Sequence, residues 1–204
     1  MSLSQWLFAA FYDLLNSSVE DRLSEYRQET AGRAKGNVLE IGGGTGANLP
    51  FYSNGLKLTI LEPNPHMSKR LRQRAKKLEF DVTVVREKGE KIPFPDKSFD
   101  SVVTTLVLCM VDDMSQVISE TRRVLKPGGV FYFYEHVASE RTLRRKFENI
   151  LNPAWRLLTT GCNLNREISS AIKNGGFEHV EIREFDLSVG ILVTIPNIVG
   201  IAKI

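Results

Sequence analysis

The stretch Val38 to Leu49, VLEIGGGTGANL, decides the fold of this chain. Its apolar beginning, Val38 to Ile41, predicts a buried strand, and four glycines follow within five positions. These are Gly42, Gly43, Gly44 and Gly46. Glycine tolerates positive φ angles and has no Cβ, so the backbone can turn sharply and a ligand can approach main-chain N–H and C=O groups. The stretch therefore predicts a strand that ends in a ligand-binding loop.

A second apolar stretch, Lys57 to Leu61, ends at Glu62. If the two strands are parallel neighbours, the Glu62 carboxylate lies beside the glycine loop, where it can bind ribose hydroxyls. Gly42, Gly44 and Ala47 also fit the dinucleotide fingerprint, and Glu62 follows Gly42 by 20 positions, as in nicotinamide-binding proteins. The spacing alone leaves the choice of cofactor open.

Three features favour S-adenosylmethionine over a nicotinamide dinucleotide. Glu40, two residues before the first glycine, suits a ligand with a cationic amino acid end better than one with an anionic pyrophosphate. GEKIPFPDKSFDSVV (Gly89 to Val103) and RVLKPGG (Arg123 to Gly129) follow in the order and spacing of later methyltransferase motifs. The chain thus resembles the class I S-adenosylmethionine-dependent methyltransferases. That resemblance implies S-adenosylmethionine as cofactor and S-adenosylhomocysteine as product.

Composition is typical of a globular protein. The chain has 204 residues, enough for one domain with a single core, and is 42% hydrophobic and 25% charged. Lys and Arg exceed Asp and Glu by 27 − 24 = 3, too small an excess to indicate nucleic acid binding. We therefore expect a small-molecule acceptor and no nucleic acid partner. The sequence does not fix the oligomeric state.

Cysteine usage and the N-terminal pattern predict a cytoplasmic protein. Cys109 and Cys162 are far apart in sequence and form neither a disulfide framework nor a C-x-x-C metal pair, so we expect no metal. The apolar run Trp6 to Phe11 lacks a basic flank and is shorter than the roughly 20 residues that span a bilayer. We therefore expect neither a signal peptide nor a membrane anchor.

The first 35 residues predict two helices. Apolar residues at helical spacing between positions 4 and 16 indicate an amphipathic helix, and a polar helix follows at about Val19 to Arg33. The first helix could pack on the domain, lie over the active site as a lid with Tyr12 reaching in, or rest on a membrane surface. Residues 1–35 are thus interpreted as a helical lid.

Beyond this lid, strands and helices alternate. The predicted strands are Asn37 to Ile41, Lys57 to Leu61, Asp81 to Arg86, Phe99 to Thr105, Val130 to Glu135, Glu178 to Phe185 and Ile198 to Ala202. The predicted helices are Ala47 to Tyr52, Pro65 to Lys77, Asp113 to Val124 and Arg166 to Asn174. Alternation of this kind predicts an α/β Rossmann-like fold, a seven-stranded, mostly parallel sheet with helices on both faces. We expect one methyltransferase domain over residues 1–204.

The stretch 137–166 interrupts this alternation and is longer than an ordinary connection. It is basic in its first part and rich in apolar residues after that. Long segments of this kind in compact domains are usually functional, so we interpret it as an insertion on the acceptor side.

The methyltransferase resemblance implies a set of cofactor-binding residues. They are Glu40, Gly42, Gly43, Gly44, Gly46, Asn48, Glu62, Pro63, Asn64, Gly89, Glu90 and Leu106. One departure concerns Lys88, which stands where many relatives carry an aspartate that receives the adenine amino group. Lysine cannot accept that hydrogen bond, so we expect the main chain of Gly89 and the side chain of Glu90 to replace it, or a looser recognition of adenine.

A closer resemblance rests on the segments EPNPHM, TTLVLCMV, EHV and GCNLNRE. They resemble the methyltransferase-like-7 proteins, the animal thiol S-methyltransferases, and their small bacterial relatives, although Gly43 stands where the animal members have cysteine. The resemblance implies a small alkyl thiol acceptor. His136 is the candidate base, since a pKa of about 6.5 suits proton transfer near neutrality. Residues interpreted as lining the acceptor pocket are Tyr12, Cys109, Trp155 and Asn163.

Other functions remain open on the sequence alone. A phosphatidylethanolamine N-methyltransferase is an alternative, because the amphipathic N-terminus and the basic, apolar stretch 141–158 could make peripheral contact with an anionic membrane. A module that binds S-adenosylmethionine or S-adenosylhomocysteine without catalysis is another. A nicotinamide oxidoreductase is a third.

Overall fold

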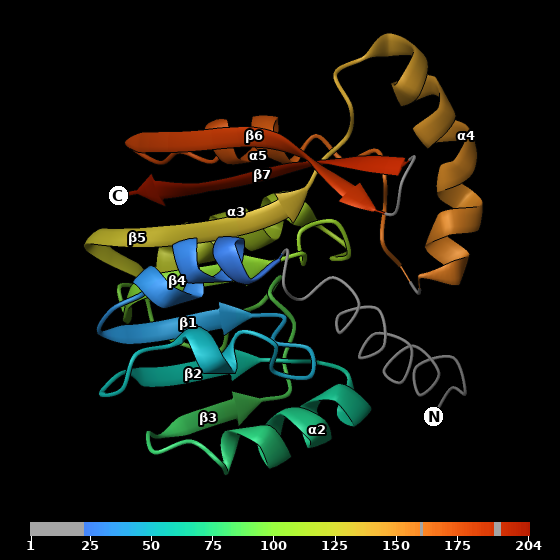
Figure 1. Cartoon of the computed structure of the whole chain (residues 1–204). Coiled ribbons are helices and arrows are strands. Elements are labelled where there is room, and N and C mark those ends of the chain that lie inside the picture. Colours follow the sequence, from blue (N-terminus) through green and yellow to red (C-terminus); the bar gives the residue numbers. More distant parts are fainter. Residues whose placement is uncertain (1–22, 160, 190–192) are drawn as a thin grey trace.

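A computed structural model describes residues 23–159, 161–189 and 193–204. Its strands are β1 (Asn37–Ile41), β2 (Lys57–Leu61), β3 (Val82–Val85), β4 (Phe99–Thr105), β5 (Leu125–His136), β6 (His179–Val189) and β7 (Val193–Lys203). They form one seven-stranded sheet in the order β3-β2-β1-β4-β5-β7-β6 (Figure 1). All neighbours are parallel except β7, which runs antiparallel to both β5 and β6. The predicted fold class is confirmed.

The register of the central strands brings their carboxyl ends to one edge of the sheet. Ile41, the last residue of β1, pairs with Leu61 at the end of β2 and with Thr104 near the end of β4. The loops that follow these three strands therefore start side by side. This edge is where open parallel sheets bind their ligands.

Helices cover both faces of the sheet. One face carries α2 (Pro65–Ala75) and the short 3-10 helices η1 (Ala31–Arg33) and η2 (Leu49–Phe51), and the other carries α3 (Met114–Val124) and α5 (Ile168–Lys173). A further helix, α4 (Thr142–Leu158), lies beyond the end of the sheet (Figure 1). Residues 23–29 are also helical. Local capping explains two of the starts: the Asn64 side chain accepts from the first amides of α2, and Asp113 accepts from Gln116 N–H at the start of α3.

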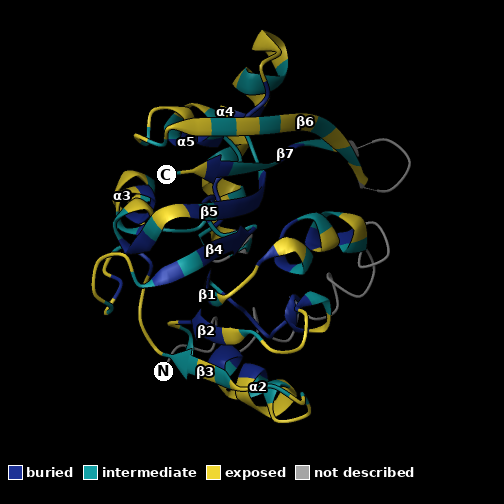
Figure 2. Cartoon of the chain, turned by 90° about the vertical axis from the view of Figure 1, so that its left-hand side faces the viewer, coloured by how far each residue is buried: buried dark blue, intermediate teal, exposed yellow. Residues whose placement is uncertain are grey.

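Two buried clusters lie on opposite sides of the sheet. One packs η1, η2 and α2 against the strands through residues such as Ala31, Leu49 and Leu71. The other packs α3 and α5 through residues such as Val117 and Ile172. Because both faces are covered, β4 is almost wholly buried, whereas the edge strand β6 is exposed along much of its length (Figure 2).

Several predicted boundaries differ from the observed ones. The helix expected over Ala47 to Tyr52 is only the 3-10 turn η2, since it follows directly on the glycine loop and contains Pro50. Strand β7 begins at Val193, earlier than the predicted start at Ile198, and therefore contains Pro196. Pairing of β7 with β5 begins only at Asn197, and the strand can therefore do without the Pro196 N–H.

The stretch to which the sequence assigned no element contains the 17-residue helix α4. It stands beyond the edge where the parallel strands end (Figure 1). The predicted N-terminal amphipathic helix and Tyr12 lie outside the described residues. Within the described ranges, no helix combines the length and the apolar character needed to cross a bilayer.

Candidate active site

The loop after β1 takes a conformation that requires glycine. Gly42, Gly44 and Gly46 have φ angles of 71°, 56° and 91°. A Cβ at Gly42 would lie 2.6 Å from a methyl carbon of Val107, in the loop after β4. The N–H of Gly42 donates to Leu61 O at 2.8 Å, which fixes the loop against the end of β2. The glycines thus let the two loops approach each other and leave main-chain groups accessible.

Glu62 ties the end of β2 to this loop. Its Oε2 accepts from Gly44 N–H at 2.8 Å and its Oε1 accepts from Asn64 N–H at 2.7 Å. The residue is 5% exposed, and burial raises its pKa to about 7 despite the two backbone hydrogen bonds. A carboxylate oxygen has two lone pairs, so each oxygen can still accept from a ligand hydroxyl.

A buried polar network supports the glycine loop from behind. Asn48 Nδ2 donates to Glu40 Oε1 at 2.9 Å and to Thr105 Oγ1 at 3.0 Å. The Tyr52 hydroxyl donates to Glu40 Oε2 at 3.1 Å, and Arg27 donates to Asn48 Oδ1 at 2.7 Å. Burial raises the pKa of Glu40 to about 7. Arg27 was not predicted as a site residue. It is 21 positions from Asn48 in the sequence, and only the fold brings the two side chains together.

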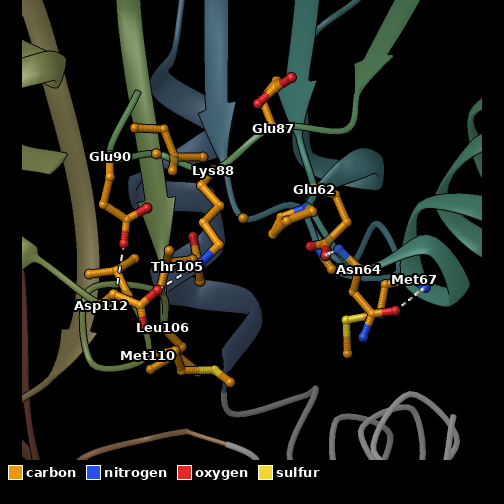
Figure 3. Close-up of a pocket in the computed structure, with 17 residues that line it drawn as sticks. Glu62, Asn64, Met67, Glu87, Lys88, Glu90, Thr105, Leu106, Met110 and Asp112 are labelled. Carbon is orange, nitrogen blue, oxygen red and sulfur yellow. Dashed lines mark hydrogen bonds and ion pairs between the residues drawn. The ribbon is translucent and has the colours of Figure 1, made fainter. Parts of the chain in front are cut away.

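A cavity of about 280 Å³ lies at the carboxyl edge of the sheet (Figure 3). Eight predicted cofactor residues line it: Gly42, Gly44, Glu62, Pro63, Asn64, Gly89, Glu90 and Leu106. Nine lining residues were not predicted as site residues: Ile41, Met67, Glu87, Lys88, Thr105, Val107, Met110, Val111 and Asp112. Glu62 and Asn64 stand on one side of it and Lys88, Glu90 and Asp112 on the other.

Four predicted cofactor residues do not line the cavity: Glu40, Gly43, Gly46 and Asn48. Glu40 and Asn48 belong to the network behind the loop. A Cβ at Gly43 would lie 2.2 Å from a methyl carbon of Ile60, and one at Gly46 would meet Leu49 and Leu71. These two glycines therefore face the core. The glycine pattern in the sequence does not distinguish them from Gly42 and Gly44, which line the cavity.

Lys88 closes one side of the cavity through an ion pair. Its Nζ lies 2.7 Å from Asp112 Oδ2, and both side chains are largely exposed. The hydrogen bond from Lys88 lowers the pKa of Asp112. Glu90 Oε1 accepts from the N–H of Asp112 at 2.7 Å, so the two loops are joined twice at this rim. The role of Gly89 and Glu90 toward adenine stays a prediction.

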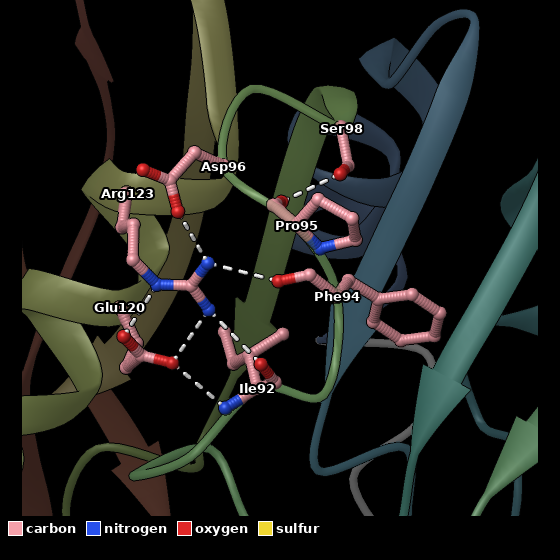
Figure 4. A network of polar contacts seen from close by, with 7 residues as sticks. All are labelled: Ile92, Phe94, Pro95, Asp96, Ser98, Glu120 and Arg123. Carbon is pink, nitrogen blue, oxygen red and sulfur yellow. Dashed lines mark hydrogen bonds and ion pairs between the residues drawn. The ribbon is translucent and has the colours of Figure 1, made fainter.

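Arg123, on α3, holds the segment that leads from this rim into β4 (Figure 4). Its guanidinium donates to the carbonyl oxygens of Ile92 and Phe94 and to the carboxylates of Asp96 and Glu120, at 2.7–2.9 Å. Glu120 in turn accepts from Ile92 N–H at 2.8 Å. Arg123 thereby links α3 to the loop that positions Gly89 and Glu90.

The turn after β4 is strained and held by a buried carboxylate. Leu106 has a φ of 56°, which is unfavourable for a residue with a Cβ and is found mostly at functional sites. Glu135 Oε2 accepts from the N–H groups of Val107 and Leu108 at 2.8 and 3.0 Å. Burial raises the pKa of Glu135 to about 7. The end of β5 thus fixes the turn that forms the apolar wall of the cavity.

Three residues predicted on the acceptor side, Cys109, Trp155 and Asn163, lie behind this turn and do not line the cavity. Asn163 donates to Cys109 O through both its backbone N–H and its side chain, each at 3.0 Å. The Nε2 of His136 lies 2.9 Å from Cys162 Sγ, and Trp155 packs against the same buried cluster. Sequence reasoning missed Cys162 as a member of this group.

The two cysteines, remote in sequence, are neighbours in the fold. Their Sγ atoms are 3.7 Å apart, and both are free thiols. Contact with Cys109, outweighing burial, lowers the pKa of Cys162, with His136 adding to the effect. Contact with Cys162 and burial raise the pKa of Cys109. Burial alone would lower the pKa of His136, but Cys162 and the nearby carboxylates raise it.

The residues at the cavity fit S-adenosylmethionine. The glycine loop offers a backbone cradle that a Cβ would fill, Glu62 keeps acceptor positions at the wall, and the turn from Leu106 to Met110 is apolar. Glu62, Asn64 and the Gly42–Gly44 backbone would hold the nucleoside and amino acid ends. Bound there, the cofactor supplies a methyl group on a sulfonium ion.

Proteins similar in sequence to this chain are methyltransferases. Residues 39–133 match the family model described as a methyltransferase domain. The human protein named thiol S-methyltransferase TMT1A is 38% identical over 96% of this chain and 82% of its own length. The phosphatidylethanolamine N-methyltransferase of Cereibacter sphaeroides is 30% identical over 69% of this chain and 68% of its own length.

The fold is also found in solved structures. A Thermotoga maritima protein described as an S-adenosylmethionine-dependent methyltransferase and possible histamine N-methyltransferase matches with a TM-score of 0.68 at 22% identity, over 98% of this chain and 99% of that one. Fold, cavity and sequence similarity over most of the chain lead to one assignment. The chain belongs to the class I S-adenosylmethionine-dependent methyltransferases, in the family that includes TMT1A.

Proposed function

We propose that this enzyme transfers the methyl group of S-adenosylmethionine to the sulfur of a small thiol. The observation that carries the proposal is the similarity of nearly the whole chain to a protein named as a thiol S-methyltransferase. The chain spans 82% of that relative, including the segments that surround the cavity.

The two buried free thiols are compatible with a reducing compartment such as the cytoplasm.

Positioning and exclusion of water are the contributions we assign to the protein. Glu62 and the glycine loop orient the cofactor, and Leu106, Val107 and Met110 form an apolar wall beside the reacting end. A small thiol is a few per cent thiolate at neutral pH and is already a good nucleophile. Aligning it in a dry site can therefore supply most of the acceleration without a covalent intermediate.

The proposed base role of His136 has to take its partner into account. The pKa of His136 is raised and that of Cys162 is lowered, which favours an imidazolium beside a thiolate. A protonated imidazole cannot accept a proton. His136 would act as a base only in molecules in which the proton resides on Cys162, so we expect the acceptor thiol to lose its proton mainly to solvent.

The test is a panel of matched acceptors. The enzyme is incubated with S-adenosylmethionine and an alkane thiol, the corresponding alcohol or the corresponding amine, and products are measured by mass spectrometry. We expect the methyl thioether alone, in amounts that fall sharply in Glu62→Ala. Methylation of the amine in preference to the thiol, or no product from any thiol, would contradict the proposal.

A phospholipid acceptor is the second candidate, and helix α4 favours it. Its exposed large apolar residues are Leu143, Phe147, Ile150, Leu151 and Leu157, which are 56–82% exposed. Lys146 and Arg156 are exposed on the same helix. An amphipathic helix with basic residues can lie in the surface of an anionic membrane. One relative of this chain is named a phosphatidylethanolamine N-methyltransferase.

Liposome flotation tests this membrane contact. We expect the protein to float with anionic vesicles and much less with neutral ones, and Phe147→Ser with Ile150→Ser to abolish flotation. Methylation of phosphatidylethanolamine in the vesicles is measured in the same samples. Flotation without phospholipid methylation would support a peripheral location and contradict the phospholipid acceptor; absence of flotation would contradict both.

A further inference from the structure

Three side chains of the kinds that bind metal ions lie together at the carboxyl edge of the sheet, and the proposed transfer does not use them as a group. Cys109 follows β4, His136 ends β5, and Cys162 follows α4. Their sulfur and nitrogen atoms all lie within 4.8 Å of one another. Such a convergence of two thiols and an imidazole from three separate segments depends entirely on the fold.

The spacing of the two sulfurs matches a tetrahedral metal site. Zn–S bonds of about 2.3 Å place two sulfur ligands about 3.8 Å apart. The Sγ atoms of Cys109 and Cys162 are 3.7 Å apart. The distance from His136 Nε2 to Cys162 Sγ is 2.9 Å, that of a hydrogen bond, and a metal would lengthen it to about 3.6 Å. Only the imidazole would have to move.

The backbone already holds the two cysteines in place. Asn163, directly after Cys162, donates twice to Cys109 O at 3.0 Å. Arg166 donates to Leu108 O at 2.7 Å, on the residue before Cys109. These bonds join the turn after β4 to the segment after α4 without using the sulfur atoms. A preorganised thiol pair of this kind lowers the cost of binding an ion.

The environment favours an ion that bonds strongly to sulfur. Cys109 is 1% exposed and Cys162 is 9% exposed, so two thiolates there need a compensating positive charge. Zn²⁺ supplies that charge and prefers sulfur and imidazole nitrogen ligands. Hard cations such as Mg²⁺ prefer oxygen and would bind poorly.

We infer that Cys109, His136 and Cys162 form a binding site for Zn²⁺ or a similar thiophilic divalent ion, with a fourth position left open. Among the residues that the structure describes, this group contains no fourth His, Cys, Asp or Glu ligand. Zinc sites with three protein ligands and an open position are typical of catalytic centres.

The open position suggests a role that rests on the proposed thiol acceptor. Cys109 belongs to the same turn as Val107 and Met110, which line the cavity. A thiol that reached the open position past this turn would bind the ion as a thiolate and release its proton to water. The ion would thereby hold the acceptor sulfur in its nucleophilic form at neutral pH.

Metal binding is tested independently of methyl transfer. Chelator-treated, reduced protein is titrated with Zn²⁺ against a chromophoric chelator, and with Co²⁺ while absorption is recorded. We expect one ion per chain and the thiolate-to-cobalt and visible bands of a tetrahedral site. Cys162→Ser, Cys109→Ser and His136→Gln should each weaken binding by about 100-fold or more, because loss of a mere outer-shell partner of a ligand already costs about 10- to 100-fold.

The matched control is His179→Gln, because His179 is exposed on β6 and pairs with Glu181. This variant should bind Zn²⁺ like the unaltered protein. Thermal unfolding and calorimetry with S-adenosylhomocysteine show whether each variant is folded. Equal Zn²⁺ affinity of folded Cys162→Ser and unaltered protein would overturn the site.

A separate measurement tests whether the fourth coordination position is open. Adding a small thiol to the Co²⁺ protein should shift the visible bands, and the corresponding alcohol should not. Absence of a shift would overturn the open position. Undiminished thiol methylation by metal-free protein would overturn the metal's role in the reaction and leave the proposed function standing, whereas bound Co²⁺ with no methylation of any thiol would overturn the proposed function alone.

Discussion

The Oε2 of Glu62 accepts a hydrogen bond from the main-chain N–H of Gly44 at 2.8 Å, and so ties the end of β2 to the loop that follows β1. One acidic side chain thereby performs two tasks. It fixes the glycine loop, and it presents its remaining lone pairs to the cavity. The shape of the cavity and the hydrogen-bond acceptors at its wall depend on the same residue.

Replacing Glu62 should therefore weaken cofactor binding strongly. Glu62→Ala removes two hydrogen bonds made by a carboxylate, each worth roughly 1.5–3 kcal/mol. We expect the Kd for S-adenosylhomocysteine, measured by calorimetry, to rise about 10- to 100-fold. Glu178→Ala is the control, because Glu178 is exposed before β6. Equal affinities of the two variants would contradict the assigned role of Glu62.

The buried carboxyl groups should make stability depend on pH. Burial raises the pKa of Glu40 to about 7, above its ordinary value of 4.5. The native state then binds this proton more tightly than the unfolded state, so the free energy of unfolding falls as pH rises from about 4.5 to 7. The contribution of one such group is at most on the order of 3 kcal/mol.

Glu40→Gln removes this titration. The fall in the free energy of unfolding between pH 5 and 8, measured with urea, should be smaller in Glu40→Gln than in the unaltered protein. Glu62 and Glu135 still titrate, so part of the slope remains. Glu178→Gln, a substitution at an exposed position, is the matched control. A Glu40→Gln variant with the full slope would refute the elevated pKa of Glu40.

Arg27 should be essential for stability although it is remote from the glycine motif. It is 2% exposed and donates to Asn48, the residue that also binds Glu40. Arg27→Ala leaves buried partners without this charge and should lower the free energy of unfolding by about 3 kcal/mol. Arg183→Ala, which breaks an exposed ion pair with Glu29, should cost less than about 1 kcal/mol. Chemical denaturation of both variants measures the difference.

We expect that lysine cannot perform the function of Arg123. The planar guanidinium contacts two carbonyls and two carboxylates, and an ammonium cannot reproduce this geometry. We expect Arg123→Lys to lower the free energy of unfolding by about 1–3 kcal/mol and to weaken S-adenosylhomocysteine binding several-fold, since the loop with Gly89 and Glu90 loosens. Arg122→Lys, at an exposed position on the same helix, should change neither quantity.

Local patterns predicted the parts of the site that lie within one loop. The strand at Asn37–Ile41 was correct to the residue, as was Lys57–Leu61, because continuous apolar runs bounded by glycine or turn residues mark buried strands. Glu62 was predicted to lie beside the glycine loop because it directly follows the second of these strands. In contrast, Gly43 and Gly46 have the same sequence signal as Gly42 and Gly44, and only packing decides which of them faces the ligand.

The sequence by itself determined the seven strands, the glycine loop, the acid after the second strand and the family of enzymes, since each strand and each motif consists of residues that are close together along the chain. It did not determine α4. Only the tertiary structure decided that Arg27 supports the loop, that Arg123 clamps the cavity rim, and that Cys109, His136 and Cys162 meet. Contacts of this second kind join segments that are tens of residues apart. They are fixed by the pairing of strands and the packing of helices on the sheet, which short-range patterns do not specify.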